Sequence, residues 1–524
     1  MVRPRATSRL RWLAPLVAAC VATSGCAPAP ATAPPSRAPA TPETAVPSDF
    51  AEPTRPPASP LAEIPFADAV RDALDVDAIV ADLDRLQSVT DQHGGVRPAG
   101  SEGHRAAADF VADQLRSLGY HVRLQEVDLP VFTQTGPSAL EIKRAGAKAF
   151  ADLHDFKAML FSPSGELTAP LYALGYDPSA EVADTGGLGC DPEDWQNVPA
   201  GVVVLMQPGN CRRHDAVVQA QSAGAVGVIT AYPAWSRDTV LRPTLIDPAD
   251  IRIPVLGTSG AVGNALNEAA AAGASVHISV RSSNVMGTSV NVIGDAPWGD
   301  PDHVVMLGGH LDSVVDGPGM NDDGSGTMSV LGIARALAAV TGAGTASGAA
   351  TPAPAWRVRV AFWTGEEIGL WGSRAYVASL QSGAVEAYIN LDMLASPNGV
   401  REVYDGAVTP QPRDSLIVGG LLSRALSDAG LVWQTASLGG SSDHASFDRA
   451  LIPTSGLFSG ANELKTEEQA TLFGGTAGAP NDPCLHLACD RTRELDRTLL
   501  GELARAAAWG VGALASGTVQ LSGE

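Results

Sequence analysis

Apolar residues recur at helical spacing on either side of a glycine- and proline-rich turn near the amino end. The turn reads GGVRPAGSEG within residues 77–118, and the apolar positions that follow it are Ala106, Ala107, Phe110, Val111 and Leu115. Recurrence at intervals of three and four residues predicts two amphipathic helices. Ser101 is a suitable cap for the second helix, and residues 120–129 then predict a strand.

The pattern changes over residues 132–281. Short apolar runs such as GVVVLMQ, VGVITA and IPVLG alternate with turns, and HDAVVQAQSAG is the one compact helix that we expect there. Short apolar runs bounded by turn residues are typical of strands. We therefore predict a separate β-rich domain inserted after the first strand of a larger unit.

Strands and helices alternate again from residue 282, first at residues 288–293. HVVMLGGH, WRVRVAFWT, AYINLDML and IPTSGLF predict strands, and TMSVLGIARALAAV predicts a helix. Such alternation indicates an α/β fold, with a mostly parallel central sheet flanked by helices. Residues 62–131 and 282–520 would form this domain, with the low-complexity stretch TGAGTASGAATPAPA as a surface loop.

The first 61 residues do not predict a packed fold. A basic segment, MVRPRATSRLRW, precedes the apolar LAPLVAACVA, which is the pattern of a signal peptide and is too short to span a membrane stably. Cys20 and Cys26 each end a segment that resembles a lipoprotein cleavage box. We favour residues 1–26 as the signal and Cys26 as the lipid anchor, with cleavage without lipid as the alternative. The Ala/Pro-rich residues 27–61 predict a disordered tether.

Length and charge narrow the class of protein. A chain of 524 residues predicts two domains plus accessory segments. The net charge of −22 argues against a nucleic-acid partner and against electrostatic binding to anionic lipid. We therefore expect an exported monomer whose only membrane attachment is an amino-terminal lipid.

Four cysteines remain in the folded part of the sequence: Cys190, Cys211, Cys484 and Cys489. An exported chain meets an oxidising compartment, so two disulfides are expected, in any of three pairings. Proximity in the sequence favours Cys190–Cys211 and Cys484–Cys489. A four-cysteine metal site is the alternative, although no Cys-x-x-Cys spacing supports it.

Candidate chemistry lies at the predicted strand ends. His310 follows VVMLGG, the pair Glu366–Glu367 follows VAFWTG, and Asp392 follows INL. Ligands of parallel sheets collect at the carboxyl ends of strands, and zinc prefers histidine nitrogen and carboxylate oxygen. Adjacent acids such as Glu366 and Glu367 point in different directions, so one can hold a metal while the other takes a proton. Two solvated acids at a helix start are the alternative.

Further candidates lie in loops. Asp322 belongs to the tight loop GPGMNDDGSG before a helix, and Asp312 can hold the second ring nitrogen of His310. His486 lies between Cys484 and Cys489, as a ligand or as an exposed loop histidine. No His-Glu-x-x-His is present, which excludes the common single-zinc protease layout.

The segments GGHLDS, GPGMNDDGSG, GEEIGLWGS, NLDM, SDHASF and the loop from Cys484 to Asp490 occur in this order. Together they resemble secreted bacterial zinc aminopeptidases with a dinuclear site, relatives of aminopeptidase Y, glutamate carboxypeptidase and glutaminyl cyclase. The resemblance implies two zinc ions per chain and peptide substrates. It assigns His310 and Asp392 to one zinc, Glu367 and His486 to the other, Asp322 as the bridge, Glu366 as general base, and Asp443 and His444 as supporting residues.

The inserted region, with GVVVLMQPGNCRRHDAVVQAQSAGAVGVITAY and RIPVLGTSG, resembles a protease-associated domain, which implies a cover over a protease site.

Two departures from the aminopeptidases stand out. Leu485 replaces a tyrosine that is thought to stabilise the oxyanion, and the loss of one such donor costs a factor of about 100 to 1,000 in rate. The arginine that some relatives carry is absent from residues 441–444.

An aminopeptidase is the expected function. A carboxypeptidase or a glutaminyl cyclase on the same scaffold is the first alternative. Cyclases of this type typically use one zinc, so the metal count separates them from the peptidases. A non-catalytic binding relative is the second alternative, and Leu485 is the feature that favours it.

Overall fold

The computed structural model describes residues 63–521, apart from 145–147, 179–187, 208, 210, 232–239, 241, 343–352, 382, 411 and 441. The expected signal peptide, the tether, Cys20, Cys26 and most of the low-complexity loop lie outside the described residues. Among the described helices, none combines the length and the apolar character that a membrane span requires.

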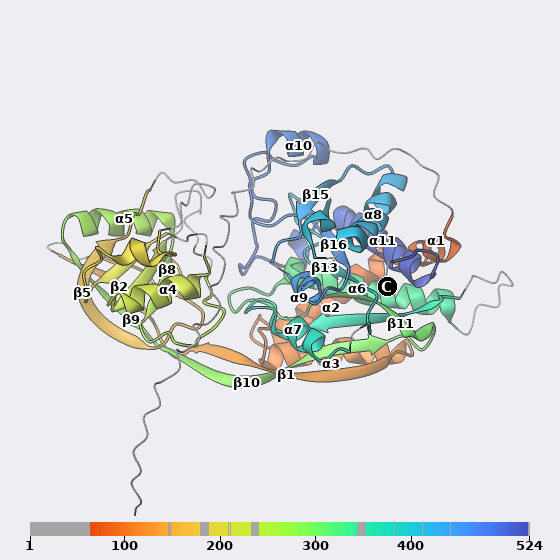
Figure 1. The fold of residues 1–524 in the computed structure, drawn as a ribbon, viewed down its shortest axis with the longest axis horizontal. Coiled ribbons are helices and arrows are strands. Elements are labelled where there is room, and N and C mark those ends of the chain that lie inside the picture. Colours follow the sequence, from red (N-terminus) through yellow and green to blue (C-terminus); the bar gives the residue numbers. More distant parts are fainter. Residues whose placement is uncertain are drawn as a thin grey trace, which may run out of the picture. The chain divides into compact units, whose positions relative to one another are not determined.

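The larger sheet has eight strands in the order β1-β10-β12-β11-β13-β16-β14-β15 (Figure 1). The bounds are β1 (His121–Gln134), β10 (Ser282–Asp295), β12 (Trp356–Trp363), β11 (Asp300–His310), β13 (Ala387–Leu391), β16 (Thr454–Phe458), β14 (Glu402–Asp405) and β15 (Gln434–Ser437). From β12 to β16 neighbouring strands run parallel, which confirms the predicted sheet. Antiparallel pairs flank this parallel centre.

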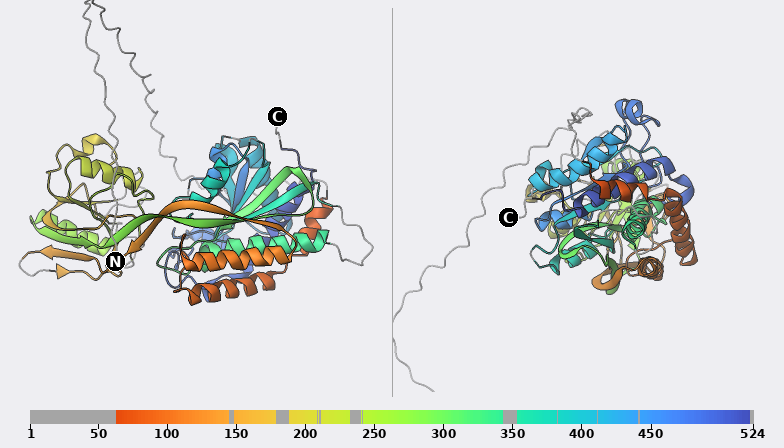
Figure 2. Two further views of the ribbon diagram at one scale, coloured as in Figure 1. Left: turned by 90° about the horizontal axis from the view of Figure 1, so that it is seen from below. Right: turned by 90° about the vertical axis from the view of Figure 1, so that its right-hand side faces the viewer.

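Helices cover both faces of this sheet. Successive residues of a buried strand point to opposite sides, so both faces carry apolar side chains that need covering. In β11, Val305 and Leu307 pack into one core while Val304 and Met306 pack into another. The first face carries α1 (Pro65–Asp72), α2 (Val76–Gln92), α3 (Glu102–Ser117), α6 (Gly326–Thr341), α8 (Pro412–Asp428) and α11 (Arg497–Ala515) (Figure 2). The second face packs against α7 (Trp371–Ala378) and α9 (His444–Arg449).

The two helices predicted on either side of the early turn are present as α2 and α3. Ser101 caps α3 as expected, since its side chain accepts a hydrogen bond from the His104 amide. Helix α1 was not predicted. Its eight residues are too few for a clear periodic pattern, and it is stabilised by packing against α11.

The inserted region forms a second sheet of eight strands in the order β3-β2-β9-β5-β6-β7-β8-β4, with its own apolar cores. The bounds are β2 (Ala139–Lys143), β3 (Lys148–Ala149), β4 (Phe156–Ala158), β5 (Gly165–Ala173), β6 (Val203–Met206), β7 (Gly227–Ala231), β8 (Val255–Thr258) and β9 (Ser275–Val280). Strands β1 and β10 lead into and out of this sheet as a continuous antiparallel ladder that reaches Gln134 and Ser282.

The expectation of a single helix in the insert was wrong. Besides α4 (Arg213–Ser222), the structure contains α5 (Gly260–Ala271). Val262, Leu266 and Ala269 of α5 are buried at helical spacing, so the signal was present but hidden among alanine and glycine residues.

Buried charges join the insert to the larger unit. Asp316, in the loop after β11, accepts from Lys157 at 2.9 Å and from Arg242 at 3.1 Å. Burial acts to raise the pKa of Asp316, but Arg242 and Lys157 bring it below the ordinary aspartate value. Val315 and Ile368 add apolar contact, since both pack against a core of the insert.

Asp316→Ala should destabilise this junction. The side chains of Lys157 and Arg242 are only 7% and 6% exposed, so the substitution leaves two buried cations without their carboxylate. Breaking a buried pair costs about 3–5 kcal/mol, measurable by urea unfolding. Glu166→Ala is the control, because its pair with Arg281 is more than half exposed on both sides and should contribute less than about 1 kcal/mol. Equal losses in the two variants would contradict the assignment.

Candidate metal centre

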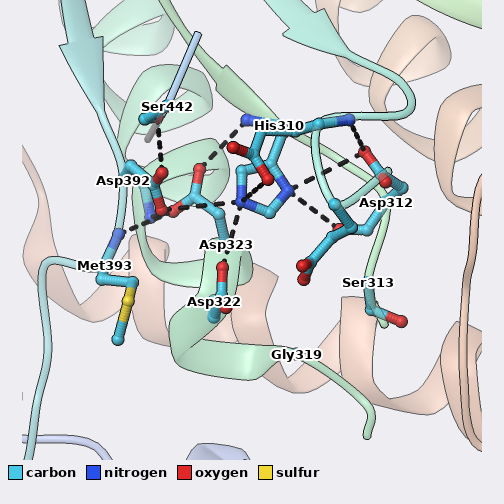
Figure 3. Close-up of polar contacts among 12 residues, drawn as sticks. His310, Asp312, Ser313, Gly319, Asp322, Asp323, Asp392, Met393 and Ser442 are labelled. Atoms are coloured by element: carbon cyan, nitrogen blue, oxygen red, sulfur yellow. Dashed lines mark hydrogen bonds and ion pairs between the residues drawn. The ribbon is translucent and has the colours of Figure 1, made fainter. Parts of the chain in front are cut away.

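Three parallel strands end at the same edge of the larger sheet and place acidic and histidine side chains together. His310 is the last residue of β11, Asp392 directly follows β13, and Glu366 follows β12 after a short turn. Because β11 lies between β12 and β13, His310 is at the centre of the group. Figure 3 shows one edge of the His310 ring turned toward Asp322 and Asp392 and the other toward Asp312.

Asp322 contacts both histidines through different oxygens. Its Oδ1 lies 3.0 Å from His310 Nε2, and its Oδ2 lies 3.0 Å from His486 Nε2. One carboxylate therefore faces two imidazoles at once, which is the arrangement that a bridging ligand requires.

Each histidine has a second carboxylate beside it. His310 Nε2 is 3.5 Å from Asp392 Oδ1, and His486 Nε2 is 3.2 Å from Glu367 Oε2. Glu366 lies further away, with Oε2 3.9 Å from His310 Nε2. The structure thus forms two groups, His310 with Asp392 and His486 with Glu367, which share Asp322.

The donor set fits metal cations. Asp392 Oδ1 and Glu367 Oε1 are buried, and neither has a hydrogen-bond partner among the described residues. A buried carboxylate oxygen without a partner is costly unless a cation compensates for it. His310 Nδ1 lies 3.0 Å from the Asp312 carbonyl and donates to it, so Nε2 is the ring nitrogen that faces the carboxylates.

Asp323 is a competing candidate for a metal ligand. Its carboxylate forms one possible ligand group with His310 and Asp392, and Asp322 and Glu367 form another group with His310. Its oxygens, however, accept hydrogen bonds from the amides of His310 (3.2 Å), Gly326 (2.9 Å) and Met393 (3.1 Å). These three donors fix the loops around the site. Asp322 faces the histidines instead, so we take Asp322 as the ligand candidate.

Asp312 supports the site differently from the expectation. The carbonyl of Asp312, not its carboxylate, meets the His310 ring; Asp312 Oδ1 lies 3.8 Å from Nδ1. The same Oδ1 accepts a hydrogen bond from the Glu366 amide at 3.2 Å. Asp312 therefore ties His310 to the loop that carries both glutamates.

The SDH segment contains a contact that the sequence did not reveal. Ser442 Oγ donates to Asp392 Oδ2 at 2.6 Å and accepts from Asn390, which orients Asp392. His444 Nε2 donates to the Leu438 carbonyl and does not join the metal-ligand groups of the described residues. Burial raises the pKa of Asp443 to about 7. The only signal for Ser442 was its place in this segment.

Arg97 and Asp490 both hold the loop between His310 and Asp322. The buried guanidinium of Arg97 donates to the carbonyls of Leu311 (2.7 Å), Pro318 and Gly319 (2.6 Å). Asp490 accepts from the amides of Asn321 (2.6 Å) and Asp322 (3.2 Å). A guanidinium that donates to the carbonyls and a carboxyl group that accepts from the amides fix the backbone that carries Asp322. From the sequence alone, nothing distinguished Arg97 from the other residues of the turn GGVRPAGSEG.

Comparison with known proteins agrees with this geometry. The sequence model of peptidase family M28 matches residues 291–510, and that of the PA domain matches residues 167–266. The probable lipoprotein aminopeptidase LpqL of Mycobacterium tuberculosis is 35% identical over 464 residues, which cover 85% of this chain and 86% of the relative. An aminopeptidase of Pseudomonas aeruginosa is 32% identical over 431 residues, covering 80% and 77%. The chain belongs to peptidase family M28.

The fold agrees as well. The structure of BSAP, a zinc aminopeptidase from Bacillus subtilis, superposes with a TM-score of 0.59 at 23% identity and covers 86% of this chain and 96% of that one. The resemblances to a zinc-peptidase family and to a protease-associated domain are thus confirmed.

In this M28 peptidase the Cys484–Cys489 disulfide brackets His486, and Cys190–Cys211 lies in the insert, so both expected pairings form. His486 has a φ of 58° and its side chain is 31% exposed. Its ring nevertheless contacts Asp322 and Glu367, so it is not a free loop histidine.

Removing the Cys484–Cys489 bridge should weaken one metal position. The double substitution Cys484→Ser/Cys489→Ser frees the backbone of His486, and loss of such support lowers metal affinity about 10- to 100-fold. Titration with a competing chelator would measure this. Cys190→Ser/Cys211→Ser, which removes the insert's bridge, should leave metal affinity unchanged; an equal loss there would show a general folding effect.

The charged groups of the M28 centre shift one another's pKa values. Burial lowers the pKa of His310, but Asp392 and Glu366 raise it well above the ordinary histidine value. Burial acts to raise the pKa of Asp322, whereas hydrogen bonds from His310 and His486 lower it overall. Burial and the charges of Asp392 and Glu367 raise the pKa of Glu366 well above its usual range. Such crowding of carboxylates is relieved by bound cations.

Proposed function

We propose that this M28 peptidase is a zinc-dependent aminopeptidase that removes amino-terminal residues from peptides. The observation that carries the proposal is the Asp322 carboxylate, which has one oxygen 3.0 Å from His310 and the other 3.0 Å from His486. Two relatives that align over most of the chain are named aminopeptidases, and the Bacillus subtilis structure of similar fold is a zinc aminopeptidase.

Two zinc ions per chain would be held by His310, Asp392 and Asp322 on one side and by His486, Glu367 and Asp322 on the other. Two of these carboxylates, Asp392 and Glu367, each keep a buried oxygen without a partner among the described residues, which supports this division. When bound, the zinc ions would supply the positive charge that polarises the scissile carbonyl and acidifies water. Leu485, next to His486, offers no hydroxyl that could share this task.

Glu366 is the residue that we assign as general base. It is buried beside the two groups, and its backbone is fixed by the hydrogen bond to Asp312. At 3.9 Å from His310 Nε2, its Oε2 stands outside the closest contacts and is free to accept a proton from the attacking water. The same carboxyl would then return the proton to the leaving amine.

Metal count and substrate choice together test the proposal. We expect elemental analysis of the purified chain to give two zinc ions, and chelation to abolish hydrolysis of leucine p-nitroanilide until zinc is restored. The N-acetylated substrate should remain intact, since a free amino terminus is required. One zinc with cyclisation of amino-terminal glutamine would favour the cyclase alternative. Cleavage of carboxyl-terminal residues instead would favour a carboxypeptidase.

We also infer that the protein is exported and lipid-anchored at Cys26. Two disulfides and a relative named a lipoprotein aminopeptidase support export and a lipid. Incorporation of labelled fatty acid should depend on Cys26. If Cys26→Ser retains the label and Cys20→Ser loses it, the anchor is Cys20.

A further inference from the structure

The short loop that carries both candidate glutamates has an unusual backbone. This glutamate loop covers residues 364–370, between the last residue of β12 and the first residue of α7. Gly365 and Gly369 have φ of 69° and 119°, and Leu370 has φ of 60°. The left-handed region is unfavourable for a residue with a side chain, so the conformation of Leu370 persists only where surrounding contacts hold it. The contacts of the glutamate loop therefore decide where Glu366 and Glu367 lie.

The side chain of Asn291, in β10, joins the two ends of the glutamate loop. Its Oδ1 accepts a hydrogen bond from the Thr364 amide at 3.0 Å, and its Nδ2 donates to the Gly372 carbonyl at 2.9 Å. The same Nδ2 donates to Gln125 Oε1 in β1 at 3.1 Å. Thr364 is the first residue of the loop and Gly372 is the second residue of α7. One side-chain amide thus fixes both the entry and the exit of the loop.

The ends of the glutamate loop pack closely against Asn291. The Gly372 amide donates to the Thr364 carbonyl at 2.7 Å, which closes the loop at its base. A Cβ atom on Gly372 would collide with Asn291 Oδ1 and with the Thr364 carbonyl. Only glycine permits so close an approach of the backbone. The start of α7 is therefore seated directly on the Asn291 amide.

A second polar side chain of β10 contacts the same place. Ser289 lies two residues before Asn291, so both side chains point to the same face of the strand. Ser289 Oγ is 2.6 Å from Thr364 Oγ1 and accepts a hydrogen bond from the Gly100 amide at 3.0 Å. Both Ser289 and Asn291 are buried, and buried polar side chains are costly unless they are hydrogen-bonded. Here their hydrogen bonds go to the glutamate loop.

We propose that Asn291 is a positioning residue for the general base, because through the glutamate loop it sets where Glu366 lies relative to the metal centre. The proposal rests on the proposed peptidase function. Asp312 holds the Glu366 amide at 3.2 Å, so the loop is fixed at its base by Asn291 and at Glu366 by Asp312. Asn291 is fully buried, so its loss should change kcat more than KM. Glu367 belongs to the same loop, so its zinc position should weaken as well.

Asn291→Ala tests the proposal by removing the amide that joins the loop ends. At zinc concentrations that fill both positions, kcat for leucine p-nitroanilide should fall about 10- to 100-fold while KM stays within about twofold. Asn284→Ala is the matched control. Asn284 lies on the same strand, and its side-chain amide donates to the carbonyls of Phe161 and Ser162 in the insert. Its substitution should leave kcat unchanged.

A double substitution separates positioning from a general loss of structure. With Glu366→Gln no proton acceptor is left to misplace, so adding Asn291→Ala should lower kcat by less than about threefold. An equal loss in both backgrounds, or a folded Asn291→Ala variant with wild-type kcat, overturns the proposal. Ser289→Ala removes only one hydroxyl and serves if Asn291→Ala does not fold. It should lower kcat in the wild type but not in Glu366→Gln, and equal or absent losses overturn the proposal in the same way.

Zinc affinity separates this proposal from the proposed function, because its measurement needs no turnover. Titration with a competing chelator should show one zinc ion bound about 10- to 100-fold more weakly in Asn291→Ala, and no change in Asn284→Ala. If the wild type hydrolyses no aminoacyl substrate but this difference is found, the proposed function fails and the role of Asn291 in holding the loop stands. If the wild type is active while Asn291→Ala keeps its kcat and both zinc affinities, the positioning role fails alone.

Discussion

Glu366→Gln is expected to lower kcat by a factor of about 100 to 10,000 while the zinc content stays at the wild-type level. A carboxamide cannot accept a proton from water, yet it has nearly the same size as the carboxyl and fits the same buried position. Glu366 lies 3.9 Å from His310 Nε2, further than any of the four closest carboxylate contacts of the two histidines, so its loss should not disturb the ligands.

Glu367→Gln is the matched control, because it makes the same chemical change one residue further along the chain. Glu367 Oε2 is 3.2 Å from His486 Nε2, so this variant should lose zinc from that position together with its activity. Elemental analysis and steady-state kinetics on both variants measure the difference. If the two variants lose the same amount of zinc, the division of roles between these neighbours is wrong.

Arg97→Ala should have the second largest effect, on stability and on metal binding together. The substitution removes the donor to the carbonyls of Leu311, Pro318 and Gly319 in a fully buried place. Loss of a buried charge that has such partners costs about 3–5 kcal/mol in the free energy of unfolding. The loop to Asp322 loosens as well, so zinc affinity should fall about 10- to 100-fold.

Two comparison variants show whether Arg97 positions the loop or only fills space. Arg97→Lys keeps the charge, but its single ammonium cannot reproduce the planar fork, so it should recover only part of the stability and zinc affinity. Arg105→Ala removes an exposed arginine from α3, paired with Asp109, and should change stability by less than about 1 kcal/mol. If Arg97→Ala binds zinc as tightly as the wild type, the loop does not depend on this contact.

The sequence predicted the strands of the parallel centre because each is a short apolar run that ends in polar residues. His310, Glu366 and Asp392 could be grouped from these runs, since parallel strands end at one edge of a sheet. The sequence did not predict helices α1 and α5. The apolar pattern of α1 is too short to recognise, and that of α5 is hidden among alanine and glycine residues. The antiparallel ladder of β1 and β10 extends well past the expected strand segments, to Gln134 and Ser282. Polar stretches give no periodic signal at that junction.

The cysteine pairs were also accessible from sequence. Short separations in an exported chain favoured Cys190–Cys211 and Cys484–Cys489, and both bonds are present. The residues around His486 left a ligand and an exposed loop histidine equally open. Only the resemblance to the zinc aminopeptidases grouped it with Asp322 and Glu367, and the structure brings these three side chains together.

What the sequence alone determined was the set of chemically capable residues and the strand ends that carry them. What only the tertiary structure decided was the set of contacts that hold neighbouring acids in different positions. Asp322 faces two histidines while adjacent Asp323 is occupied by backbone amides, although a sequence pattern treats the two acids alike. Arg97 meets Leu311 across 214 residues of sequence, and Ser442 meets Asp392 across 50. Such contacts arise from packing of distant segments, so local periodicity carries no record of them.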